Sequence, residues 1–268
     1  MSKSDSVERF LATGEHDPAF PSWGGDAAAG AASLARVLRR VVRWRAKGAP
    51  LPARSGPARP IEAVSARIAP LVTGLFGDRP ALTRALADRV QVVTVSRFVE
   101  GLEDLPLEVQ WTLANLLLDD LGAPPLSDDA PQLDGFCAEG RAWVLPRAFD
   151  PSGGPTDVVV HEVAHLLHEL TRGELAAAPA DAPLLAVPAN QRETWAYACE
   201  VWAWATRDQP EADVLAQRIA PSEHGRAHTD ARVDAPLLHQ ILAAAVAAPE
   251  QGWALLRAGV GAPDPLPL

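Results

Sequence analysis

Three ionisable side chains stand within one five-residue run, His161-Glu162-Val163-Ala164-His165. On a helix, residues four positions apart lie on one face, about 6 Å apart along the axis, so both imidazoles can face a single ion. Glu162 lies about a quarter turn away, where its carboxylate can reach a water on that ion. Two neutral imidazoles and a carboxylate suit Zn²⁺. The run therefore predicts a zinc site that carries its own general base.

The residues around this run are mostly apolar, with Val158-Val159-Val160 before it and Leu166-Leu167 after it. A helix of this composition is expected to be buried, and ionisable groups on a buried helix need a partner such as a metal ion. The alternative is a pair of surface histidines beside a glutamate. We expect the metal site.

A catalytic zinc takes a third protein ligand and leaves one position for water. The helix predicted over residues 191–207 offers Glu193, which is our expected ligand, and Glu200 as the alternative. Glu200 also suits a second role, in which it orients one of the histidines from outside. A competing role for Glu193 is a capping box with Asn190 as the N-cap.

Tyr197 is the chain's one tyrosine, and it follows Glu193 by one helical turn. A phenol near zinc can donate a hydrogen bond to the oxyanion that forms when water attacks a carbonyl, so Tyr197 is a second candidate catalytic residue beside Glu162. The alternative is a tyrosine of the core. His228 could serve the same purpose but reads better as a loop histidine, and His168 is expected outside the ligand set or on the surface.

These residues resemble the gluzincin group of zinc metallopeptidases, in which H-E-x-x-H on one helix is followed by a glutamate on a later helix. The Glu-x-x-Ala form of Glu193-Thr-Trp-Ala196 is also similar to lethal-factor-like and ImmA/IrrE-like peptidase domains. The resemblance covers residues 133–207. It implies peptide-bond hydrolysis with Glu162 as base and Tyr197 as a possible oxyanion donor. The chain departs from the thermolysin-like pattern, because Arg192 and Tyr197 stand where that pattern has asparagine and aspartate.

The hydrophobic periodicity predicts a mostly α (α+β) protein. Residues 1–25 read as an irregular arm, residues 26–122 as a helical region, and residues 123–268 as a zincin-like domain with C-terminal helices. Helices are expected over 26–47, 61–76, 80–97, 105–121, 191–207 and 211–219. A short hairpin is expected within 133–146, just before the helix of the His-Glu run, and Asp104 and Gly122 are expected to bound the helix over 105–121.

The composition narrows the class of protein. Hydrophobic residues make up 48% of the 268, and the net charge is −10, which argues against nucleic acid or an anionic membrane as the main partner. No stretch approaches the roughly 20 apolar residues that span a bilayer, and the N-terminus has no signal-peptide pattern. The two cysteines, Cys137 and Cys199, make no disulfide framework, so a cytoplasmic location is expected.

The expected function is that of a zinc-dependent metallopeptidase acting on a peptide or protein. Zinc held by His161, His165 and Glu193 would lower the pKa of its water toward about 7, and Glu162 would take the proton. The hairpin ending near Val144 could pair with an extended substrate by adding a strand. One alternative is a catalytically silent or structural zinc module that acts through protein–protein interaction, and another is a hydrolase of non-peptide amides.

Overall fold

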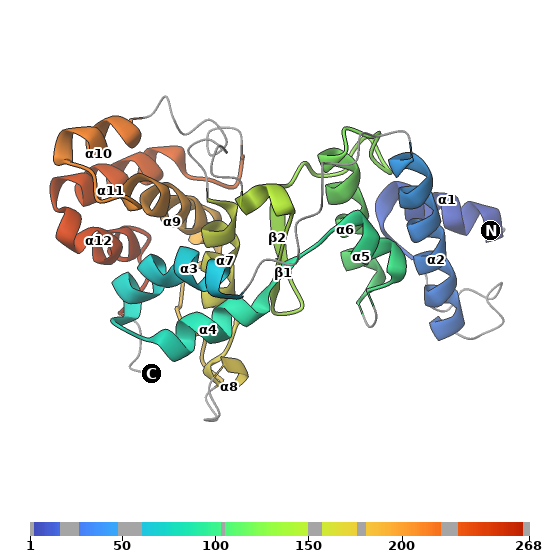
Figure 1. Cartoon of the computed structure of the whole chain (residues 1–268), viewed down its shortest axis with the longest axis horizontal. Coiled ribbons are helices and arrows are strands. Elements are labelled where there is room, and N and C mark those ends of the chain that lie inside the picture. The colour runs from blue at the N-terminus through green and yellow to red at the C-terminus, as the bar shows by residue number, and fades with distance from the viewer. Residues whose placement is uncertain are drawn as a thin grey trace. The chain divides into compact units, whose positions relative to one another are not determined.

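The computed structural model describes residues 3–16, 27–47, 61–102, 105–149, 157–175, 181–220 and 230–264. The protein is mostly helical with a small three-stranded sheet, as predicted (Figure 1). Its contacts divide it into two compact units, Met1–Gly56 with Val92–Asp134 and Pro57–Gln91 with Gly135–Leu268. Residues 61–91, expected in the N-terminal helical region, thus belong to the second unit, because their helices pack there.

The first unit is helical, and its elements are α1 (Lys3–Thr13), α2 (Ala27–Ala46), α5 (Val95–Glu100) and α6 (Leu107–Asp120). Helix α1 lies where an irregular arm was expected. It forms because Phe10 is fully buried and the Trp111 indole donates to the carbonyl of Leu11 at 2.9 Å. Gly14, at φ +75°, ends it.

Helix α6 confirms the helix predicted over 105–121. It begins after Pro106, and Gly122 follows its end at φ +61°. The expected N-cap, Asp104, lies outside the described residues.

The second unit begins with α3 (Ile61–Phe76), α4 (Pro80–Arg89) and β1 (Val90–Val92), of which the last residue is counted with the first unit. Helix α3 has the predicted bounds. The single helix predicted over 80–97 is wrong, because the chain leaves α4 at Arg89 and runs as a strand before α5. The β-branched residues Val90, Val92 and Val93 favour this extended segment, and Thr94 then caps α5 by accepting a hydrogen bond from the Arg97 amide at 3.2 Å.

The predicted hairpin is confirmed as β2 (Gly135–Ala138) and β3 (Arg141–Val144), paired antiparallel with Phe136 opposite Trp143. Its turn residues, Glu139 and Gly140, have φ of 53° and 62°, and a positive φ at both central residues is what a two-residue type I′ turn requires. The strand order is β1-β3-β2, so among the described strands β2 lies at an edge of the sheet.

The remaining helices of the second unit are α7 (Val158–Glu169), α8 (Arg172–Leu175), α9 (Arg192–Thr206), α10 (Ala212–Arg218), α11 (Ala235–Ala247) and α12 (Gly252–Gly259). Short 3₁₀ segments lie at Pro146–Phe149, Ala189–Gln191 and Pro249–Gln251. Helices α9, α10, α11 and α12 confirm the helices expected over 191–207 and 211–219 and at the C-terminus. No helix in the described part of the chain has the length and apolarity needed to cross a membrane.

Helix α7 is the centre of this unit and packs against α9, α3, β2 and β3. Its residues are buried from Val158 to His168, as the apolar pattern predicted. Asp157 caps its first turn by accepting from the Val160 amide at 3.2 Å, and the same carboxylate accepts from Arg67 of α3 at 2.8 Å. These contacts fix the start of the helix that carries the His-Glu run.

Candidate metal centre

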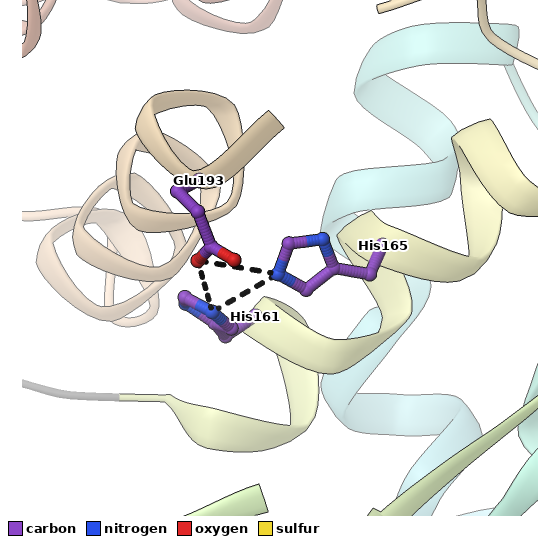
Figure 2. A group of neighbouring side chains, drawn as sticks. All are labelled: His161, His165 and Glu193. Atoms are coloured by element: carbon purple, nitrogen blue, oxygen red, sulfur yellow. Dashed lines mark hydrogen bonds and ion pairs between the residues drawn. The ribbon is translucent and has the colours of Figure 1, made fainter. Parts of the chain in front are cut away.

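Helices α7 and α9 bring together the three side chains expected to bind zinc (Figure 2). The Nε2 atoms of His161 and His165 are 3.3 Å apart. Glu193 Oε2 lies 3.7 Å from the first and 3.6 Å from the second. In a tetrahedral zinc site with bonds of about 2.0–2.1 Å, ligand atoms lie about 3.3–3.4 Å apart. The spacing of these three atoms therefore fits a zinc ion.

The environment of the three atoms also suits a metal. His161 and His165 are only 5% and 9% exposed, because α7 lies in the core. Glu193 Oε2 is buried without a hydrogen-bond partner. A carboxylate oxygen in such a position is costly unless a cation satisfies it. The residues present thus fit a bound cation.

Each histidine also has a polar contact at Nδ1, the ring nitrogen that faces away from the other two candidate ligands. His161 Nδ1 lies 2.9 Å from Glu200 Oε2, and His165 Nδ1 lies 3.1 Å from His168 Nε2. For both Nε2 atoms to bind an ion, each Nδ1 must carry the ring proton and donate a hydrogen bond to its partner, Glu200 or His168. The structure therefore places Glu200 in the orienting role and not with the ligand atoms, and it places His168 as the partner of His165.

The capping role considered for Glu193 is not seen. Helix α9 begins at Arg192 with Gln191 as its N-cap, and no side chain caps it. Asn190 lies in the preceding 3₁₀ segment. The second oxygen of Glu193, Oε1, instead forms an ion pair with Arg232 Nη1 at 2.6 Å. The Glu193 carboxylate therefore does not cap the helix, and it faces the two histidines.

The electrostatics of the site follow from burial and close charges. Burial lowers the pKa of His161, but the hydrogen bond and charge of Glu200 outweigh it, and the net effect raises the pKa. Burial raises the pKa of Glu193, but His165 and Arg232 outweigh it, and the net effect lowers the pKa. Glu193 therefore stays an anion, which is the form that binds a metal.

Glu162, the expected base, is 4% exposed, and burial raises the pKa of its carboxyl group against the pull of His161 and His165. Its side chain lies against the first residue of β2. A Cβ added to Gly135 would stand 3.0 Å from both Cγ and Oε1 of Glu162. On the same strand, the Cys137 thiol donates to the Glu162 carbonyl at 3.0 Å. The edge strand thus positions the candidate base.

Tyr197 lies on α9 one turn after Glu193, as predicted. Its ring packs edge-on against His161, with centroids 4.6 Å apart at 76°. His228 lies outside the described residues. Gly135, Arg232 and Asp230 were not predicted as site residues, because they reach the site from distant segments and no local sequence pattern marks them.

Replacing Gly135 with alanine is expected to disturb the base without removing the metal site. The added methyl group would meet Glu162 and the Trp143 carbonyl at 3.0 Å, so Glu162 must shift. Contacts at this distance are relieved by a movement of a few tenths of an ångström. Because a displacement of about 1 Å can cost about 100-fold in rate, the hydrolysis proposed below should fall by a smaller factor, about 3–10-fold, at unchanged zinc content. Unchanged hydrolysis would show that Glu162 needs no such positioning.

Comparisons with protein-family models, curated proteins and solved structures find no match to this chain.

Proposed function

We propose that this chain is a zinc-dependent hydrolase of peptide bonds, with His161, His165 and Glu193 as the metal ligands and Glu162 as the general base. One observation carries the proposal. Three donor atoms from two helices lie 3.3–3.7 Å apart, and one of them is a buried carboxylate oxygen without a hydrogen-bond partner.

The number of ligands favours catalysis over a structural zinc site. A structural zinc is closed by four protein ligands, whereas a catalytic zinc has three and an open position. Within the described residues, the candidate cluster has three members, His161, His165 and Glu193. Glu200 and His168, the residues best placed to close it, contact the far nitrogens of the two rings. A silent structural module is therefore the weaker alternative.

Each residue of the site has a separate role in the proposed peptide hydrolysis. The bound ion would polarise the scissile carbonyl and lower the pKa of the attacking water. Glu162 takes the proton from that water and delivers it to the leaving amine, and its raised pKa suits both transfers. Tyr197 is the candidate donor to the oxyanion, because its ring lies against His161. Glu200 and His168 hold the imidazoles in the tautomer that points Nε2 inward.

The edge strand supports a peptide as the substrate over a small amide. Strand β2 has β3 on one side and, in the described sheet, no strand on the other. An extended peptide can add to such an edge through main-chain hydrogen bonds. The first residue of β2, Gly135, lies against Glu162, so a peptide added to this strand would run beside the candidate base.

The direct test is cleavage of a peptide mixture by purified protein, followed by mass spectrometry. Zinc-loaded protein is expected to generate new peptide termini that are absent after chelation and return when zinc is restored. Cleavage that is unchanged by chelation would contradict a metal-dependent mechanism. Zinc binding without any cleavage would favour the silent module.

A further inference from the structure

The two oxygens of Glu193 have different partners. Oε2 lies 3.6 Å from His165 Nε2 and 3.7 Å from His161 Nε2. Oε1 is 2.6 Å from the Nη1 of Arg232, whose side chain is 62% exposed. A carboxylate can bind a metal through one oxygen or both, and here a guanidinium occupies one of the two.

The guanidinium is itself held in place by Asp230. Arg232 Nε donates to Asp230 Oδ1 at 3.0 Å, and Nη2 approaches Oδ2 at 2.8 Å. The same Oδ1 accepts from the Arg232 amide at 2.9 Å. A planar fork bound through two nitrogens has little freedom, so its third nitrogen is fixed toward Glu193.

The segment carrying both residues is also tied to the first turn of α9. The Asp234 amide donates to the hydroxyl of Thr194 at 3.0 Å. Thr194 is fully buried, and it directly follows Glu193 in the sequence. The Asp234 side chain in turn caps α11 by accepting from Leu237. Arg232 therefore meets Glu193 from a segment whose C-terminal residue, Asp234, is bonded to both α9 and α11.

We propose that Arg232, oriented by Asp230, is a positioning residue that keeps Glu193 a one-oxygen ligand and so preserves an open position for water on the metal. The proposal rests on the proposed metal site. If Glu193 bound through both oxygens, the ion would be five-coordinate with its water included, and the second oxygen would crowd the position that the attacking water needs. Arg232 prevents this by holding Oε1 outside the ligand set.

The test uses cobalt(II) as a spectroscopic substitute for zinc, because the intensity of its visible absorption falls as the coordination number rises. The parent should give the strong absorption of a four-coordinate ion. Arg232→Gln and Asp230→Asn should each weaken that absorption severalfold, since Glu193 is then free to bind through both oxygens. Arg232→Lys keeps a charged donor and should recover part of the parent spectrum.

Arg218→Gln is the matched control, because Arg218 forms a comparable pair with Asp208 outside the site and should give the parent spectrum. In the zinc forms, the Arg232→Gln variant should lose kcat with little change in KM. Cobalt spectra that match the parent in both site variants would overturn the inference, and a rise in KM alone would make Arg232 a substrate contact instead. Failure of the parent to take up cobalt or zinc would overturn this inference and the proposed function together.

Discussion

Replacing Glu162 with glutamine is expected to leave zinc bound and to lower peptide hydrolysis by about 10²–10⁴-fold, the usual contribution of a general base. Glutamine keeps the size of the side chain, so its contact with Gly135 is retained. It cannot take the proton from the attacking water. The measurement is kcat on a cleaved peptide, beside zinc content for the same preparation.

Glu169→Gln is the control, because Glu169 lies on the same helix but is exposed at its C-terminal end. It should retain the parent rate. A Glu162→Gln variant that cleaves as fast as the parent would remove Glu162 from the mechanism, even if zinc proved essential.

Zinc is expected to stabilise the folded protein through His161, and this effect should vanish in His161→Ala. An ion that binds only the folded state adds about 4 kcal/mol at a free concentration of about 1,000 times its Kd. Removing one of two imidazoles leaves too few ligands for tight binding. Denaturation with and without zinc gives the change in the free energy of unfolding that zinc causes in each protein. The stability lost through the substitution itself cancels in this difference.

His239→Ala is the matched control, because His239 is exposed on α11 and should leave the zinc effect intact. If zinc stabilised His161→Ala as much as the parent, the ion would be bound elsewhere.

Sequence patterns predicted the parts of the fold that are set locally. Helix α3 and the β2–β3 hairpin follow from helical periodicity and from turn residues within a few positions of one another. Strand β1 was missed because its partner is β3, about fifty residues later, and three residues carry too little periodicity to mark a strand. Helix α1 was missed because its stability depends on Trp111, far along the chain.

The candidate site shows the same division. His161, Glu162 and His165 could be identified from spacing alone, because one helix sets their relative positions. Glu193 needed a second helix packed against the first, and the capping alternative was excluded only by the structure. Arg232 and Gly135 reach the site through tertiary contacts that no local pattern encodes.

The zinc content of purified, tag-free protein, measured by inductively coupled plasma mass spectrometry beside Glu193→Ala, tests the central claim most directly. The geometry of His161, His165 and Glu193 predicts about one zinc per chain in the parent and a sharp loss in the variant. Full zinc content in the variant would remove Glu193 from the ligand set. No metal in either protein, even after zinc is added, would contradict the account.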